Sequence, residues 1–298
     1  MLAAPLTAVQ GLAMTLMWSI APGITLEVTW MQNGAKVIVV MPAYNAATTL
    51  EDTYRTLAMD VVDEVILVDD VSHDETVDIA NRLGLKVVVH VQNRGYGGNQ
   101  KTCYFEALRS GADVVVMVHP DNQYDATLLP KLIQPIIDAE CDIVLGSRIA
   151  SGRAVKDGMP IWKYVANRFL TGVENLAFGL RMSEYHTGFR AFSRQVLETL
   201  PFTLNSDDFV FDQEIMAQAM CFGFRVGEIP VPTRYFPEAS SVNFRRSVQY
   251  GISVLRVVAR FLLHQSGLVR SRQLSVRLED VLSPHYREAI TGKTERPS

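Results

Sequence analysis

Short runs of apolar residues alternate with segments of helical periodicity over the first half of the chain. The runs are rich in Val, Ile and Leu, which predicts buried strands. We expect strands at residues 36–42, 65–69, 86–91, 113–119 and 142–145. We expect helices between them at residues 48–57, 74–83, 98–109 and 127–139. This alternation predicts an α/β fold whose sheet is mostly parallel and covered by helices on both faces.

The pattern changes after Arg148, where longer helices and loops follow. We expect helices at residues 162–178, 209–219 and 247–264, a strand at 225–230 and a loop at 232–243. No internal repeat or low-complexity linker interrupts the chain. We therefore expect one domain over residues 36–244, an amphipathic helical segment over 245–282 and a polar tail over 283–298.

The N-terminal residues 1–35 are expected to form an extension. Residues 1–26 carry no charge and residues 12–20 are apolar, but Thr, Gln and Ser dilute the stretch. No Lys or Arg precedes it, which disfavours a secretory signal. Three forms stay open: a membrane span, a helix that touches the membrane, or an ordinary packed or disordered extension.

Composition narrows the range of partners. The net charge of −4 and the pI of about 5.9 argue against nucleic acid as a partner, because such proteins carry a basic footprint. Residues 245–278 are an exception, since they hold seven arginines and no acid. The three cysteines are isolated, without metal-binding spacing, and are expected to be small core residues.

Polar residues follow the predicted strands, and in parallel sheets the carboxyl ends of the strands form the ligand site. Asp69 and Asp70 end a buried strand, which suits a ribose diol, a base edge or a metal, although one of them could cap the next helix. The glycine-rich residues 92–101 could bind an anion at a helix N-terminus, or form a tight turn.

The stretch from His119 to Asp125 offers several hard oxygen ligands directly after a strand. A divalent cation bound by Asp121 would neutralise a diphosphate, whereas Asp125 fits a helix N-cap. Arg148 follows the next strand and suits phosphate. His186 is expected to be a structural histidine more often than a catalyst.

The loop at residues 234–246 combines hydroxyls, aromatic rings and adjacent arginines, and it leads into an apolar, arginine-bearing helix. Such a helix is typical of a segment that lies at a membrane interface. The alternative is a C-terminal helix packed on the core.

Taken in order, these motifs resemble glycosyltransferase family 2, and in particular its dolichyl-phosphate mannose and polyprenyl-phosphate glucose synthase branch. The resemblance covers residues 36–246. It rests on the segments 42–45, 68–74, 92–101, 121–123, 146–148 and 187–190.

The resemblance implies a GT-A fold, a UDP- or GDP-activated sugar, Mn²⁺ or Mg²⁺, and inversion at the anomeric carbon. It makes residues 36–244 the catalytic domain. The residues implied for the nucleotide sugar are Pro42, Tyr44, Asn45, Asp69, Asp70, Gly97, Lys101 and Asp121. The implied metal residues are Asp121, Gln123 and His119, and those for the acceptor phosphate are Arg148, Arg234, Ser241, Arg245 and Arg246.

The chain departs from the family pattern at several positions. His119 stands where an acid usually begins the metal motif, Ala46 replaces another acid, and Tyr185-His186 stand where an acid usually precedes the Thr-Gly-Phe-Arg motif. Imidazole favours a softer ion than Mg²⁺. We therefore hypothesise that His119 ligates or borders the metal, with Mn²⁺ preferred.

A polyprenyl phosphate acceptor is ionised at neutral pH and needs no strong base, so arginines and a metal would screen the repulsion between donor and acceptor. We expect Asp121, Arg148, Arg190 and Asp208 to take part in the transfer. The enzyme would act on the cytoplasmic, inner face of the membrane as a peripheral protein, and its oligomeric state stays open. Two alternatives remain: transfer to a hydroxyl group with Asp207, Asp208 or His186 as base, and a non-catalytic homologue that binds nucleotide sugar.

Overall fold

The structure is a computed structural model that describes residues 14–21, 24–30, 34–232 and 244–291. It divides into two compact units, Met1–Ala35 and Lys36–Ser298. In the first unit, β1 (Met14–Ala21) and β2 (Ile24–Trp30) form an antiparallel pair. Of the three forms left open for this extension, the two helical ones are therefore not observed in these residues. The reason lies in β2, where apolar and polar residues alternate with the period of a strand.

Across the described ranges, no helix is both long and apolar enough to cross a membrane.

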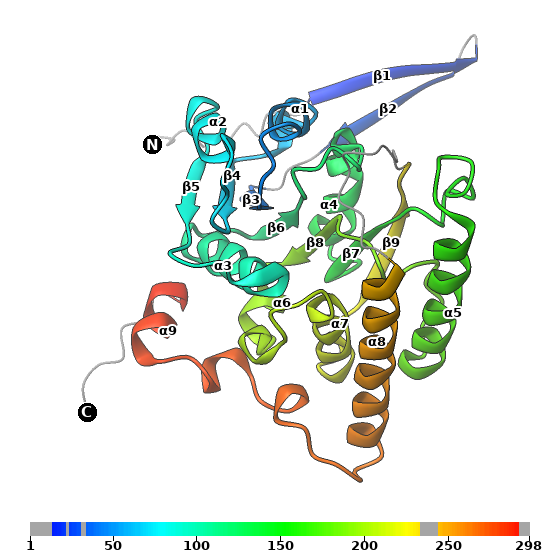
Figure 1. Cartoon of the computed structure of the whole chain (residues 1–298). Coiled ribbons are helices and arrows are strands. Elements are labelled where there is room, and N and C mark those ends of the chain that lie inside the picture. The colour runs from blue at the N-terminus through cyan, green and yellow to red at the C-terminus, as the bar shows by residue number, and fades with distance from the viewer. Residues whose placement is uncertain (1–13, 22–23, 31–33, 233–243, 292–298) are drawn as a thin grey trace, which may run out of the picture. The chain divides into compact units, whose positions relative to one another are not determined.

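The second unit is built on a seven-stranded sheet (Figure 1). Its strands are β3 (Val37–Ala43), β4 (Glu64–Asp69), β5 (Lys86–Val89), β6 (Val114–Met117), β7 (Ile143–Ser147), β8 (Arg190–Ser193) and β9 (Val226–Pro230). Their order across the sheet is β5-β4-β3-β6-β8-β7-β9, and β8 runs antiparallel to both of its neighbours. The carboxyl ends of the six other strands therefore meet at one edge of the sheet.

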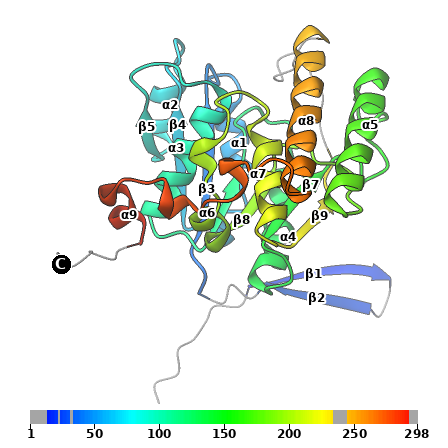
Figure 2. The same cartoon turned by 90° about the horizontal axis from the view of Figure 1, so that it is seen from below.

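Helices cover the sheet on both sides (Figures 1 and 2). They are α1 (Leu50–Arg55), α2 (Thr76–Arg82), α3 (Gly95–Arg109), α4 (Leu129–Ile137), α5 (Ile161–Phe178), α6 (Arg194–Thr199), α7 (Phe211–Cys221), α8 (Phe244–Gln265) and α9 (Pro284–Thr291). Short 3-10 turns lie between them, including η1 (Met59–Val61), η2 (Ala126–Leu128) and η5 (Leu278–Asp280).

Strand β3 shows why both faces are covered. Its side chains alternate between two buried clusters, so that Ile38 and Val40 pack with α3, α6 and α7. Val37, Val39 and Met41 pack with α1, α2 and α4 on the other face. The predicted α/β fold with helices on both faces is confirmed.

Three features of the second unit differ from the sequence-based expectations. Strand β8 was not predicted; it begins at Arg190, the last residue of the Thr-Gly-Phe-Arg motif, and has four residues. The glycine-rich loop is the first turn of α3, which begins at Gly95. The polar tail contains α9, because Ile290 is buried in the core and its carbonyl oxygen accepts a hydrogen bond from Arg194.

The order of the strands places a site between β3 and β6. From β3 the chain builds β4 and β5 on one side and then returns to add β6 on the other. Loops that leave β3 and β6 therefore diverge, and ligands of such sheets bind at that divergence. The loops that follow β3, β4 and β6 begin at Tyr44, Asp70 and Val118.

Candidate active site

The three loops at this edge are tied to one another. Asn45 donates its backbone N–H to Ser72 Oγ, and its side-chain oxygen accepts the N–H of His73. Asn122 donates its N–H to Thr53 Oγ1 on α1. Asn45, Val71 and Asn122 all have positive φ, at 51°, 67° and 53°. Such conformations are costly for residues other than glycine and cluster at functional sites.

Asp69 is the residue at this edge that is best placed to accept a hydrogen bond from a ligand. It is 1% exposed, and its Oδ2 accepts the N–H of Ser72 at 2.9 Å. Its Oδ1 is buried and has no hydrogen-bond partner. A buried carboxylate oxygen without a partner is unfavourable until a ligand donates to it. Tyr44 lies one residue after β3 and is half exposed, as an open site requires. Pro42 and Asn45 flank it on the strand and in the loop.

Asp70, in contrast, is used within the protein. It accepts the backbone N–H groups of Arg94 and Gly95 at the start of α3, and it lies 2.7 Å from His90 Nδ1. This side chain caps α3 and positions the loop, and its contact with the nucleotide stays a prediction. Sequence could not separate the two acids, because both follow the same strand.

Gly97 and Lys101 contact the segment before α7. Gly97 donates its N–H to the carbonyl of Asp207 at 2.8 Å, and a Cβ at this position would lie 2.3 Å from the carbonyl oxygen of Ser206. Lys101 is buried, and its ammonium donates to the Asn205 carbonyl and to Asp207 Oδ1. Close packing accounts for the glycine and an ion pair engages the lysine, so the nucleotide contacts of both residues stay predictions.

His119 lies in the loop after β6, in a partly buried position. Its ring stacks on Tyr96 with ring centroids 5.4 Å apart, and its Nε2 is 3.3 Å from the Tyr96 hydroxyl. Burial lowers the pKa of His119, against the nearby negative charges of Asp121 and Asp212, which raise it. A neutral imidazole is the form that ligates metals.

Arg190 does not reach the surface of the site. It is 1% exposed and is ion-paired with Asp212 at 3.2 Å, and it donates to the carbonyl oxygens of Thr187 and Tyr185. Burial alone would lower the pKa of Arg190, but the Asp212 charge leaves it raised overall. The predicted role in transfer is corrected to that of a buried cation, which balances an acid that sequence reasoning missed.

Asp121 and Gln123 lie two residues apart in the loop after β6. Asp121 is partly buried, and its Oδ1 accepts the N–H of Gln123, a buried residue. Among the described residues no group of three or more His, Cys, Asp or Glu side chains has the arrangement of a metal centre. His119 and Asp121 nevertheless fit a site completed by substrate oxygens, because ions bound with phosphates often have one or two protein carboxylates. Asp125 caps η2 through Thr127 N, as predicted.

Arg148 is engaged by an acid that was not predicted. Glu184 is fully buried, and its carboxylate accepts the Arg148 backbone N–H and pairs with the guanidinium, which also donates to the carbonyl oxygen of His186. The Arg148 side chain is 15% exposed. A phosphate bound by Arg148 would share the guanidinium with Glu184, and this role of Arg148 stays a prediction. In the sequence, the one sign of this partner was an acid, Glu184, six residues before Arg190.

His186 belongs to a buried polar cluster that joins α5, α7 and α8. Its Nε2 lies 3.1 Å from Glu174 on α5, and its Nδ1 lies 2.9 Å from the Tyr250 hydroxyl on α8. Gln213 of α7 bonds to both His186 and Tyr250. Burial and then the Glu174 charge raise the pKa of Tyr250 well above its ordinary value. These contacts make His186 a structural residue that anchors the long helices.

The remaining predicted residues lie at the surface or outside the described part of the chain. Asp208 is exposed, and its carboxylate accepts the N–H of Phe209. Arg245 and Arg246 are exposed at the start of α8, and the Arg246 guanidinium lies 5.2 Å from the ring centre of Phe209. Arg234 and Ser241 lie outside the described residues.

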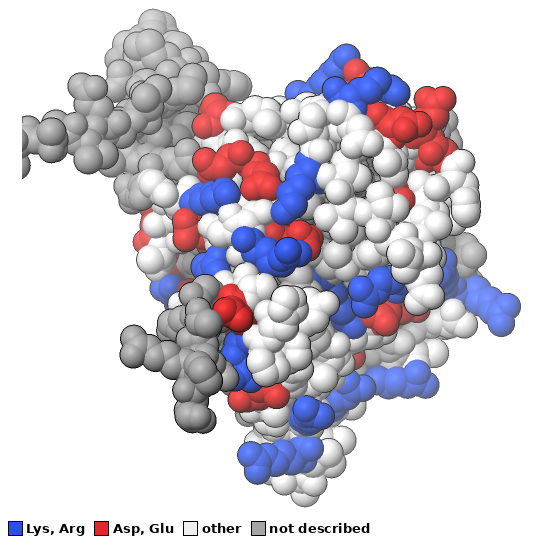
Figure 3. Space-filling model, turned by 90° about the vertical axis from the view of Figure 1, so that its left-hand side faces the viewer, with Lys and Arg blue, Asp and Glu red and all other residues white. Residues whose placement is uncertain are grey.

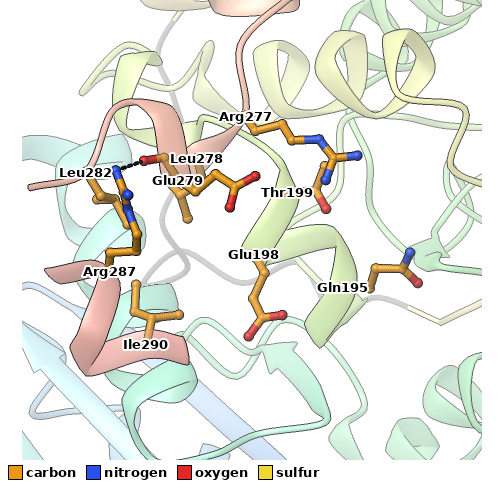
Figure 4. Close-up of a pocket in the computed structure, with 9 residues that line it drawn as sticks. All are labelled: Gln195, Glu198, Thr199, Arg277, Leu278, Glu279, Leu282, Arg287 and Ile290. Atoms are coloured by element: carbon orange, nitrogen blue, oxygen red, sulfur yellow. Dashed lines mark hydrogen bonds between the residues drawn. The ribbon is translucent and has the colours of Figure 1, made fainter. Parts of the chain in front are cut away.

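A cavity of about 300 Å³ lies elsewhere, between α6, η5 and α9 (Figure 4). Its lining includes Glu198, Arg277, Glu279 and Arg287. Helix α6 follows β8, which runs against the other strands, so this cavity lies at the opposite edge of the sheet from Asp69. It is not part of the strand-end site.

Comparisons with known proteins agree with this geometry. The family described as glycosyl transferase family 2 matches residues 38–200. A UDP-N-acetylglucosamine–dolichyl-phosphate N-acetylglucosaminyltransferase of Methanococcus voltae is 31% identical over 216 residues, 67% of this chain and 86% of that protein. A dolichyl-phosphate hexose transferase of Haloferax volcanii is 28% identical over 222 residues, 74% of this chain and 92% of that protein.

Solved structures show the same fold. Glucosyl-3-phosphoglycerate synthase of Mycobacterium tuberculosis, in complex with phosphoglyceric acid, matches 78% of this chain and 81% of its own with a TM-score of 0.60 and 20% identity. Its complex with Mn²⁺, UDP-glucose and phosphoglyceric acid matches 80% and 82%, with a TM-score of 0.56 and 20% identity. The chain belongs to glycosyl transferase family 2, and it is a glycosyltransferase with the GT-A fold.

Proposed function

We propose that this enzyme moves a hexose from a UDP- or GDP-sugar to a polyprenyl phosphate of the dolichyl type, with inversion at the anomeric carbon. The names of the M. voltae and H. volcanii relatives support the acceptor, since both name dolichyl phosphate. The M. tuberculosis complex with UDP-glucose and Mn²⁺ supports a nucleotide-sugar donor and a divalent cation.

The observation that carries the proposal is that the arginine-rich helix α8 begins beside the strand-end site. The Arg246 guanidinium lies 5.2 Å from the Phe209 ring centre, and Phe209 packs on Tyr96 with ring centroids 4.7 Å apart. Tyr96 in turn stacks on His119. Two aromatic rings thus connect Arg246 with His119, which supports an acceptor phosphate that approaches the proposed donor site from this side.

Helices α5 and α8 together present an apolar surface suited to the lipid portion. They lie side by side, as Leu170 faces Gly251 and Phe178 packs on Phe261 (Figures 1 and 2). The exposed apolar residues of this α5/α8 surface are Ile161, Trp162, Val165, Phe169, Leu176, Val248, Ile252, Leu255, Leu262 and Leu263. On each helix they follow the spacing of one face. Exposed apolar stripes flanked by arginine fit an anionic membrane surface.

Charge elsewhere is mixed. On the face that Figure 3 shows, uncharged residues cover most of the surface, and groups of Lys and Arg side chains are scattered among groups of Asp and Glu side chains. The run of arginines without acids over residues 245–278 therefore gives the enzyme a local basic segment in a chain of net charge −4. We propose that the enzyme binds the cytoplasmic, inner face of the membrane through α5 and α8, as a peripheral protein.

The mechanism assigns three tasks to this chain. Asp69 Oδ1 accepts a hydrogen bond from the nucleotide part of the donor. His119 and Asp121, with Gln123 nearby, would hold the divalent cation, which neutralises the diphosphate leaving group when bound. Arg245 and Arg246 attract the acceptor phosphate, whose oxygen attacks the anomeric carbon as the bond to the diphosphate breaks.

A panel assay tests the proposal. Purified enzyme is mixed with UDP-glucose, UDP-galactose, UDP-N-acetylglucosamine or GDP-mannose, with Mn²⁺ or Mg²⁺, and with or without a short polyprenyl phosphate. We expect one donor to release its nucleoside diphosphate only when the lipid phosphate is present. If the nucleoside diphosphate is released equally with and without the lipid, the acceptor is a hydroxyl group instead. The exposed Asp208 would then be the base to test. No donor binding would favour the non-catalytic alternative.

A further inference from the structure

A chain of three side chains runs beneath the predicted metal residues. Asp212 of α7 accepts a hydrogen bond from the Tyr96 hydroxyl, with an oxygen–oxygen distance of 2.9 Å. The same hydroxyl lies 3.3 Å from His119 Nε2. The three residues come from α7, α3 and the loop after β6, so the fold brings them together over long distances in the sequence.

Asp212 is fixed as an acceptor. It is 7% exposed, its Oδ1 accepts from Gln100 Nε2 at 3.1 Å, and its Oδ2 lies 3.2 Å from the Arg190 guanidinium. Both carboxylate oxygens of Asp212 therefore face donors: Gln100 on one side, and the Tyr96 hydroxyl and the Arg190 guanidinium on the other. The Tyr96 hydroxyl is the donor in its contact with Asp212, because the carboxylate oxygens can only accept.

Counting protons then determines the state of His119. The one phenolic proton of Tyr96 is donated to Asp212, which leaves the phenolic oxygen as an acceptor toward His119. His119 Nε2 must therefore carry the proton of this contact. In a neutral imidazole the other ring nitrogen, Nδ1, then has the lone pair.

Gly188 closes the Nε2 side of the ring. A Cβ at position 188 would lie 2.4 Å from His119 Cδ2 and 2.8 Å from Nε2, so the motif backbone packs directly against that edge. The Nε2 edge of the ring is therefore flanked by the Tyr96 hydroxyl and by the backbone at Gly188. The Nδ1 atom lies on the opposite edge of the ring, and Asp121 follows two residues later in the same loop.

We propose that Asp212 and Tyr96 are positioning residues that hold His119 in the Nε2–H tautomer and so present Nδ1 as a ligand for the divalent cation beside Asp121. The proposal rests on the metal site of the proposed function and adds to it which atom binds and what fixes it. Carboxylate-linked partners of this kind orient metal-bound histidines, and their loss commonly weakens metal binding by about 10- to 100-fold.

The first test reads the tautomer without metal or substrate. The full chain is labelled with ¹⁵N-histidine, and long-range ¹H–¹⁵N spectra are recorded at pH 8, with His119 assigned from the signal lost in His119→Gln. We expect the pattern of an Nε2–H imidazole. An Nδ1–H pattern in the unmodified protein would overturn the proposal, whatever the transferase assay shows.

The second test uses Mn²⁺ alone, with the free ion measured by electron paramagnetic resonance. Tyr96→Phe removes the acceptor and is expected to give a mixture of tautomers and about 10-fold weaker Mn²⁺ binding. Tyr104→Phe is the matched control, because this buried tyrosine of the same helix bonds to Gln100 Oε1 and not to His119. We expect the control to bind Mn²⁺ like the unmodified protein. An unchanged tautomer and unchanged Mn²⁺ affinity in Tyr96→Phe would contradict the proposal. If the unmodified protein shows the expected tautomer but no transfer to the lipid, only the proposed function is contradicted.

Discussion

At the scale of single residues, the two adjacent acids at the end of β4, Asp69 in the strand and Asp70 after it, have opposite tasks. Asp69 has one buried oxygen without a partner, whereas Asp70 accepts hydrogen bonds from the start of α3. An unsatisfied buried carboxylate favours ligand binding at a cost in stability, and a satisfied one favours the fold.

This difference predicts opposite outcomes for the same substitution. Asp69→Asn keeps an acceptor for Ser72 and removes an uncompensated buried charge, so stability should be kept or rise while nucleotide binding weakens about 10-fold. Asp70→Asn loses charge-assisted bonds and should destabilise the protein by about 1–3 kcal/mol. Calorimetric titration with UDP or GDP, together with thermal unfolding, separates the two. Equal loss of stability in both variants would contradict the assignment.

Val71, in the same loop, has a backbone conformation whose cost in folding free energy can be tested. It is β-branched and has a φ of 67°, where an L-residue loses about 1–2 kcal/mol. Val71→Gly should therefore raise the free energy of unfolding by about 1 kcal/mol, measured by urea denaturation. Val62→Gly is the control, since Val62 is also partly buried but has a φ of −116°, and it should lower stability. A similar loss in both variants would show that packing of Val71 outweighs its strain.

Sequence predicted where the site lies but not what each charge contacts. Asp69, His119 and Asp121 follow strands, and strand ends are visible in apolar runs. The partners of Arg148 and Arg190 are Glu184 and Asp212, which lie on other elements. An arginine bound to phosphate and one bound to a buried acid look alike in a sequence, because the fold alone decides which partner is near.

At the scale of elements, the buried parallel strands were predictable and the exceptions have physical causes. Each central strand is a continuous apolar run, because both of its faces are covered. Strand β8 has four residues, too few to show a period, and its pairing with β6 and β7 is set by the sheet. The glycines of α3 disfavour a helix, but Asp70 caps its start and Gly97 allows close packing on Ser206.

The ends of β7 and β9 are joined by an ion pair with a predictable pH dependence. Arg225 donates to both oxygens of Asp142 and to the carbonyl of Ala139. The Arg225 hydrogen bond, as the largest favourable cause, holds the pKa of Asp142 below its ordinary value of 3.8. A lowered carboxyl pKa contributes stability that is present above the unfolded pKa and lost as the pH falls through the folded pKa.

We therefore expect Asp142→Asn to be less stable than the unmodified protein at pH 7, with the difference shrinking as the pH falls below 3.8. Urea denaturation over this pH range measures it. Asp60→Asn, which changes an exposed acid on η1, should show no such pH-dependent difference. A constant difference between Asp142→Asn and the unmodified protein at all pH values would mean that the ion pair does not stabilise the junction.

At the scale of the catalytic unit, the strand-end site and the α5/α8 surface are connected through α8. The proposed donor site lies at the carboxyl ends of the strands, and the contact of Arg246 with Phe209 links the start of α8 to it. The His186 cluster ties α5, α7 and α8 together beneath this region. A rigid connection of this kind would hold the site at a fixed height above a membrane to which α5 and α8 bind.

The last prediction concerns membrane binding by the α5/α8 surface. Phe169 on α5 and Ile252 on α8 are 61% and 45% exposed, and each lies within an apolar stripe. Placing a glutamate in either stripe removes apolar burial in the interface and repels anionic lipid, so Phe169→Glu and Ile252→Glu should each lower binding to vesicles that contain anionic lipid by about 10-fold. Co-sedimentation with such vesicles and with purely zwitterionic ones measures both effects. Met59→Glu alters a comparably exposed apolar residue, at 45%, on η1 and should bind like the unmodified protein. If only Ile252→Glu binds more weakly, α8 alone contacts lipid, and if neither does, the stripes serve another partner.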